Sequence, residues 1–147
     1  MDVEALTARV GEHIGVGDWL LVDQARVDAF ADATIDHQWI HRDGPEADAG
    51  PFGGPIAHGF LTLSLLPHLL STAPPLTDGA AMMVNYGLDR VRFVTPVPVG
   101  SRVRASVALK EVSPIVNGAQ ITVAVTIEME GSERPAAYVE SVLRVFG

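Results

Sequence analysis

The chain has 147 residues, of which 48% are hydrophobic and 19% charged, and we expect residues 1–147 to form a single domain with a buried core. Ten Lys and Arg residues against eighteen Asp and Glu residues give a net charge of -8, so the overall field repels polyanions and nucleic acid is not an expected partner. The absence of cysteine excludes disulfides, thiolate metal sites and thiol nucleophiles, which leaves oxygen and imidazole groups for any catalysis.

The N-terminal segment has neither the charge nor the apolar length of a targeting or membrane segment. Met1 to Glu4 is acidic where a signal peptide is basic, and no stretch of the chain reaches about 18 consecutive apolar residues. We therefore expect a cytoplasmic protein without a membrane partner.

The first clear element is a helix that begins after Asp23. Aspartate is a favoured N-cap residue, and Val27, Phe30 and Ala31 follow at the i, i+3, i+4 spacing of an amphipathic helix. The pattern predicts that this helix ends near Ile35.

Residues 36–55 predict a long ordered loop with at most one helical turn, because Gly and Pro are frequent after Arg42. Trp39, Ile40 and Phe52 supply apolar anchors for it. Loops of this length in compact domains are often functional, so we look for the site here.

Residues 56–71 predict a helix that is apolar on nearly every face and is therefore enclosed on all sides. Pro67 removes one backbone hydrogen bond, so it kinks or ends the regular part.

The second half predicts at least four strands. Apolar and polar residues alternate in 101–109 and 121–129, and segments 80–93 and 137–146 complete the set. Asn117-Gly118 is a turn signal for an antiparallel hairpin. The fold class is therefore α+β, with an antiparallel, meandering sheet wrapped around the long helix.

Asp36 and His41 are the candidates for acid–base chemistry, since a carboxylate and an imidazole on one loop can converge on a single water. A capping aspartate and a solvated histidine would give the same spacing. His37 and His41 also have the i, i+4 interval of metal ligands, but the segment lacks a regular helix and the HExxH pattern, so no metal is expected.

Gly59 lies in the first turn of the predicted apolar helix, where a free backbone N–H favours an anion and the missing side chain allows close approach. Relief of crowding between helix and sheet is the alternative role. His58 is compatible with a cap, with a bond to a loop carbonyl, or with contact to substrate.

One stretch reads Asp36-His37-Gln38-Trp39-Ile40-His41, and a second reads Gly50-Pro51-Phe52-Gly53-Gly54-Pro55-Ile56-Ala57-His58-Gly59-Phe60. Both resemble the MaoC-like dehydratases, which include the (R)-specific enoyl-CoA hydratases. Residues 85–93 and 96–103 also resemble the subgroup named after nodulation protein N.

The resemblance implies a dimeric hot-dog fold, in which a curved antiparallel sheet wraps a central helix. It implies hydration of a trans-2-enoyl thioester to the (R)-3-hydroxyacyl thioester without a cofactor. By position, Asp36 and His41 match the catalytic pair, and the backbone N–H of Gly59 matches the oxyanion donor. Ile35 stands where the wider family commonly has Gly, which adopts positive φ more cheaply.

We assign Gln38, Trp39, Phe52 and His58 to substrate binding, although for Trp39 and Phe52 packing of the loop is the more common role of such aromatic residues. An acyl-CoA or acyl-carrier-protein thioester is the expected small-molecule partner, and a second copy of the chain the expected protein partner.

Four basic residues on two sequential strands offer either a positive patch for the phosphates of such a thioester or structural ion pairs. They are Arg90, Arg92, Arg102 and Arg104.

Three other functions remain open at this point. They are a 3-hydroxyacyl carrier-protein dehydratase, a thioesterase on the same fold, and a non-catalytic protein that binds acyl thioesters.

Overall fold

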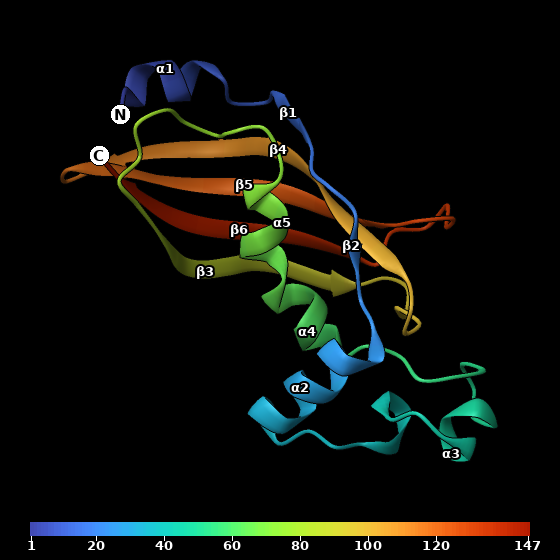
Figure 1. Ribbon diagram of the computed structural model, residues 1–147. Coiled ribbons are helices and arrows are strands. Elements are labelled where there is room, and N and C mark those ends of the chain that lie inside the picture. Colours follow the sequence, from blue (N-terminus) through green and yellow to red (C-terminus); the bar gives the residue numbers. More distant parts are fainter.

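An antiparallel sheet of six strands forms the body of the protein in the computed structural model, which describes residues 1–147 (Figure 1). Five strands follow one another in the order β1-β4-β5-β6-β3, and β2 also pairs with β4. The strands are β1 His13–Val16, β2 Leu20–Leu21, β3 Met82–Phe93, β4 Arg102–Ile115, β5 Gly118–Met129 and β6 Ala137–Phe146.

Alternation along the strands gives the sheet its apolar inner face. Val103, Ala105 and Val107 of β4 are at most 1% exposed, whereas Arg104 and Ser106, which alternate with them, are half-buried. The same alternation runs along most of β5. Because successive side chains point to opposite faces, this burial confirms the strands predicted from the alternation.

The connection between β4 and β5 lies where the sequence predicted it. Ile115 pairs with Gly118, and Asn117 between them has a φ of 61°, a left-handed conformation that asparagine tolerates better than most residues. β4, β5 and β6 therefore form the predicted meander.

The expectation of a meander through all four strands is wrong for the first of them. β3 pairs with β6 rather than with β4, which follows it in the sequence, so β3 forms one edge of the sheet. The strands β1 and β2, and helix α1 at Val3–Ala8, were not predicted. They are short, so alternation or helical periodicity has too few residues to appear.

Helices α4 (Gly59–Ser64) and α5 (Leu66–Ser71) cross the apolar face of the sheet (Figure 1). The predicted single helix is divided at Leu65, and Pro67 lies in the first turn of α5, where its missing N–H costs no helical bond. No helix in the structure has both the length and the hydropathy needed to cross a membrane.

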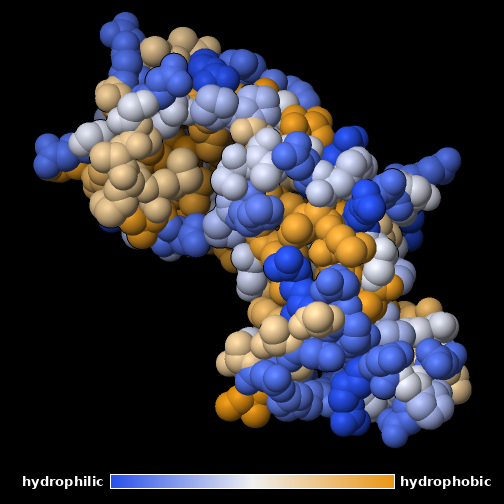
Figure 2. Space-filling model, viewed as in Figure 1, coloured by the Kyte–Doolittle hydropathy of each residue, from blue (hydrophilic) through white to orange (hydrophobic).

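The prediction that this helix is enclosed on all sides is wrong. Leu61, Leu66 and Leu69 lie in the core, but the ring of Phe60 is 69% exposed. Periodicity reports how many faces are apolar, and it does not say whether the same chain covers all of them. Figure 2 shows apolar side chains gathered on the face that carries these helices.

A smaller group of helices lies beyond the end of the sheet, near the start of α4 (Figure 1). Its members are α2 Gln24–Thr34, the 3-10 helix η1 Trp39–His41 and α3 Pro45–Asp48. The side chain of Asp23 accepts a hydrogen bond from the N–H of Arg26 at 2.9 Å, which confirms the predicted N-cap. The predicted loop contains two short helical segments, η1 and α3, where one helical turn was expected.

Candidate active site

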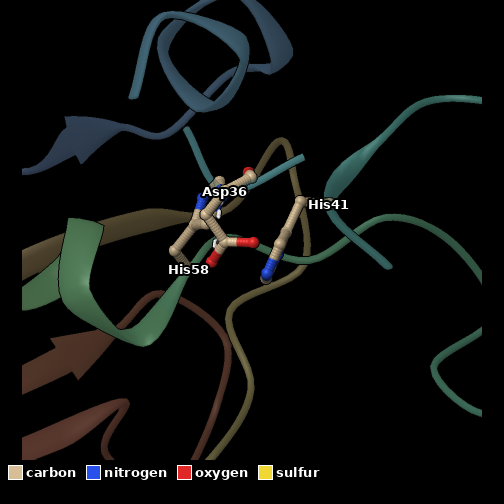
Figure 3. Close-up of side chains that lie close together, drawn as sticks. All are labelled: Asp36, His41 and His58. Atoms are coloured by element: carbon tan, nitrogen blue, oxygen red, sulfur yellow. Dashed lines mark hydrogen bonds and ion pairs between the residues drawn. The ribbon is translucent and has the colours of Figure 1, made fainter. Parts of the chain in front are cut away.

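Asp36, His41 and His58 come together from three segments, namely the residues after α2, the end of η1 and the residue before α4 (Figure 3). Each of the three side chains offers a nitrogen or oxygen atom that lies within 4.8 Å of the others. His41 and His58 are buried, with 6% and 2% exposure, whereas half of the Asp36 side chain is accessible.

The end of α2 sets the position of Asp36. Ile35 closes the helix in the left-handed conformation, with φ 60° and ψ 34°, and the N–H of Asp36 donates to the main-chain oxygen of Ala31 at 3.1 Å. Ile35 thus adopts a left-handed conformation that glycine would adopt with less steric strain. The chain reverses here, and the carboxyl group of Asp36 is left next to the two imidazoles.

Two hydrogen bonds to main-chain oxygens hold His41 in place. Its Nδ1–H donates to the main-chain oxygen of Ile56 at 2.8 Å, and its own main-chain oxygen accepts from Nε2 of Gln24 in α2 at 2.9 Å. Because a carbonyl oxygen can only accept, Nδ1 carries the proton and Nε2 of the neutral ring is an acceptor.

Burial lowers the pKa of His41 below its ordinary value. The hydrogen bond to Ile56 opposes this effect, the neighbouring His58 adds to it, and Asp36 opposes it. The ring is therefore neutral near pH 7, with the Nε2 lone pair available to a water molecule.

His58 contacts both members of the pair. Its ring stacks on that of His41, with centroids 3.7 Å apart and planes 22° apart. Its Nε2–H donates to the main-chain oxygen of Asp36 at 3.0 Å, and the same nitrogen lies 3.9 Å from Oδ2 of Asp36. The bond to a loop carbonyl was one of the three roles open to this residue, and no side-chain cap bond to α4 is formed.

Gly59 is the first residue of α4, and its backbone N–H makes no hydrogen bond within the chain. A Cβ atom added at Gly59 would lie 3.1 Å from the ring of Phe93. The structure thus shows the crowding that sequence analysis gave as the alternative role, together with an N–H free to bind an oxygen.

The remaining predicted site residues are exposed members of the loop at 36–55. The N–H of Gln38 donates to Oδ1 of Asp36 at 3.4 Å, so this residue bonds the carboxylate through its backbone. Trp39 is 37% exposed, and a Cβ added at Gly50 would come within 2.9 Å of its ring, so Trp39 packs against the loop. Phe52 is 44% exposed.

The geometry of the two buried rings argues against a shared metal ion. Nitrogen lone pairs lie in the ring planes, and two planes that are nearly parallel and stacked cannot both point at one ion about 2.0–2.1 Å from each nitrogen. The i, i+4 pair considered from the sequence does not form either, because His37 is half-exposed and its Nε2 lies 3.6 Å from Oδ1 of Asp32.

The four arginines do not form one positive patch. β5 and β6 separate β3, which carries Arg90 and Arg92, from β4, which carries Arg102 and Arg104. Glu128 accepts a hydrogen bond from Arg104 at 2.8 Å, and Glu130 lies 3.9 Å from Nε of Arg102. The ion pairs that sequence analysis left open are therefore present on β4.

Sequence reasoning missed the groups that hold His41. Gln24 is an ordinary residue in the first turn of α2, and Ile56 acts through its main-chain oxygen, which any residue type possesses. The contact between His41 and His58 could not be predicted from their sequence spacing, because the two rings stack only in the folded protein.

Comparison with known proteins identifies the family. Residues 5–131 match the family described as MaoC like domain. The 3-hydroxyacyl-thioester dehydratase Z of Mycobacterium tuberculosis is 52% identical over 143 residues, which cover 97% of this chain and 94% of that protein. Nodulation protein N of Rhizobium leguminosarum bv. viciae is 49% identical over 134 residues, which cover 88% of this chain and 81% of that protein.

Solved structures share the architecture. The (R)-hydratase from A. caviae involved in PHA biosynthesis has a TM-score of 0.70 and 26% identity, with 90% of this chain and 97% of that chain covered. A MaoC-like dehydratase from Rhodospirillum rubrum has a TM-score of 0.73 and 21% identity, with 90% and 89% covered. The chain therefore belongs to the MaoC-like dehydratase family, has its hot-dog fold and is a hydro-lyase.

Proposed function

We propose that the protein adds water to a trans-2-enoyl-CoA to give the (R)-3-hydroxyacyl-CoA, or catalyses the reverse dehydration. The observation that carries this proposal is the pairing of an accessible carboxylate, Asp36, with a buried neutral imidazole, His41, whose Nε2 is an acceptor. A carboxylate oxygen of Asp36 and a ring nitrogen of His41 lie within 4.8 Å of each other. Two acceptors that share one water, with hydrogen bonds of about 2.8 Å, are separated by about this distance.

The reaction needs one water and no other reactant. Asp36 and His41 orient the water and take one proton from it as its oxygen forms a bond to C3 of the enoyl group. The electrons of the C2–C3 double bond move toward the thioester oxygen, and a proton from the pair then goes to C2. The hydroxyl group from the water is then on C3 and a proton is on C2, and both residues return to their starting protonation states.

The charge that develops on the thioester oxygen needs a hydrogen-bond donor. The backbone N–H of Gly59 is the proposed donor, because it is unpaired and directly follows His58, which contacts both Asp36 and His41. The absence of a side chain at this position lets a carbonyl group approach the backbone closely.

A groove between α4–α5 and β3 offers space for the acyl chain. A hollow of about 450 Å³ includes Leu63 and Leu88 beside several polar residues, and a neighbouring one of about 480 Å³ includes Leu70 and Met83. The two hollows share Pro67, so the groove runs along the helices away from Gly59. Its apolar side chains suit an alkyl chain.

We further propose that two copies pair through β3, the edge strand of the sheet. Its apolar side chains are largely exposed, among them Val84, Tyr86 and Leu88 at 43%, 58% and 47%, and Phe60 of α4 adds another exposed ring. An unpaired, apolar edge strand is stabilised by pairing with a second copy.

The decisive experiment incubates the protein with crotonyl-CoA in the presence of a thiol reagent. Hydration removes the absorbance of the conjugated enoyl thioester without releasing thiol, and chiral analysis of the product after hydrolysis of the thioester gives the (R) alcohol. Release of thiol would instead identify a thioesterase. No reaction with crotonyl-CoA or with longer trans-2-enoyl-CoA esters would contradict the proposed function.

The carrier is tested with the same acyl group. We expect crotonyl-CoA to have a higher kcat/KM than crotonyl-acyl-carrier protein. The opposite order would favour the carrier-protein dehydratase considered from the sequence.

A further inference from the structure

We propose that His58 is a positioning residue that holds the two catalytic side chains at a fixed spacing, Asp36 through its main-chain oxygen and His41 through the stacked ring. This inference rests on the proposed function in so far as Asp36 and His41 act on the same water. It adds a third residue, one that touches neither water nor substrate.

Both contacts come from one buried ring. The Nε2–H of His58 donates to the main-chain oxygen of Asp36 at 3.0 Å, and the ring face lies 3.7 Å from that of His41. Phe30 of α2 packs near the same ring, with centroids 4.9 Å apart. His58 therefore joins the segment after α2 to the end of η1 at the point where the catalytic pair meets.

The other roles considered for His58 do not fit its surroundings. With 2% exposure, the residue presents almost no surface to a substrate. Its side chain makes no capping bond to the N-terminus of α4. The contacts that remain are those to Asp36, His41 and Phe30.

The hydrogen bond to Asp36 also fixes which nitrogen of His58 is the donor. Nε2–H donates to the main-chain oxygen of Asp36, and Nδ1 is buried without a hydrogen-bond partner. The ring is therefore held at Nε2 and by its stacking on His41.

Two substitutions separate the two contacts. His58→Phe keeps a flat ring against His41 but removes the N–H that binds Asp36. His58→Gln keeps an N–H donor for Asp36 but removes the ring. His68→Gln is the matched control, because His68 is an exposed residue of α5 outside the site.

With crotonyl-CoA as substrate, we expect each His58 variant to lose about 10–100-fold in kcat, since small misplacements of reacting groups have effects of this size. KM should change by less than about threefold, because substrate binding is not affected. His68→Gln should behave as wild type. Rates are expressed per folded protein, determined from near-ultraviolet circular dichroism.

Histidine NMR titration gives a readout that does not depend on activity. In His58→Gln no ring shields His41 from water, so the pKa of His41 should rise toward about 6.5. His58→Phe keeps a ring stacked on His41 and should raise that pKa less. Wild-type kcat and an unchanged His41 titration in both folded variants would overturn the proposal while the hydratase function stands. A loss carried by KM alone would also overturn it, because that result assigns His58 to substrate contact. Failure of wild type to hydrate crotonyl-CoA contradicts the function, and the titration still tests the positioning.

Discussion

His41 donates its Nδ1–H to the main-chain oxygen of Ile56 over 2.8 Å, and this single bond decides which nitrogen of the ring is free to accept a proton. Burial lowers the pKa of the same ring, with the charge of His58 acting in the same direction. The bond to Ile56 therefore sets the tautomer of His41, and burial is the main cause of its lowered pKa.

A pH profile of kcat/KM follows from this arrangement. The neutral ring is the competent form, so activity falls on the acid side as Nε2 is protonated. Because the pKa of His41 is lowered from 6.5, the midpoint of its acid limb should lie below 6.5. Rates with crotonyl-CoA between about pH 4.5 and about pH 8 measure it. A midpoint above 6.5 that disappears in His41→Gln would contradict the role of burial.

Removing either member of the proposed catalytic pair, Asp36 and His41, should abolish most of the activity. Asp36→Asn and His41→Gln should each lower kcat by about 10²–10⁴-fold, the range that general acid–base groups contribute. Asp43→Asn and His37→Gln are the matched controls, since both residues are exposed and lie outside the pair. Near-normal turnover in a folded Asp36→Asn or His41→Gln protein would show that the pair does not share the water.

The predictable part of the fold is the part with long regular patterns. The alternation in β4 and β5 and the cap at Asp23 gave the correct elements because neighbours in the sequence decide them. The pairing of β3 with β6 was not predictable, because alternation says which face is buried and not which strand lies beside it. The exposed ring of Phe60 was missed for a similar reason, since an apolar face says nothing about what covers it.

The site was predictable to the extent that its residues share one loop. Asp36 and His41 stood out because their chemistry and their spacing on a Gly- and Pro-rich loop agree. The roles of Gln24 and Ile56 depend on long-range backbone contacts, which no local pattern reports. The arginines lie on β3 and β4, which follow one another in the sequence but do not pair in the sheet.

Ile35 offers a test of backbone strain next to Asp36. Its φ of 60° is costly for a β-branched residue, and its side chain is 83% exposed, so little packing is lost on removal. Ile35→Gly should raise the free energy of unfolding by about 0.5–1 kcal/mol, the relief of strain less the added entropy of the unfolded glycine. Ile35→Val keeps the β-branched side chain and should leave the free energy of unfolding unchanged. Urea denaturation measures both, and equal stability of the two variants would show that the position is unstrained.

The edge strand β3 gives a prediction about assembly. We expect wild type to be a dimer by light scattering at micromolar concentration, and Leu88→Asp to shift it toward monomer by placing a charge on the paired surface. Val116→Asp is the matched control, because Val116 is 84% exposed at the turn between β4 and β5, and β6 separates those strands from β3. A monomeric wild-type mass would refute the pairing, and a dimer unaffected by Leu88→Asp would place the contact elsewhere.

The last prediction isolates the backbone donor at Gly59. Proline lacks an N–H, and His58 before it has φ -59° and ψ 138°, the extended conformation that a following proline prefers. Gly59 is also the first residue of α4, where no helical hydrogen bond is lost. Gly59→Pro therefore removes the proposed donor and leaves the helix intact.

Phe93 complicates this experiment, because a Cβ atom at position 59 would lie 3.1 Å from its ring. The comparison is therefore made in a Phe93→Ala background, which removes the ring and is tolerated because Phe93 is 47% exposed. In that background Gly59→Ala adds bulk but keeps the N–H, whereas Gly59→Pro removes the N–H. We expect kcat for Gly59→Pro to fall about 10²–10³-fold below that for Gly59→Ala, the effect of losing one oxyanion donor. Equal turnover of the two folded double variants would mean that the thioester oxygen finds its donor elsewhere.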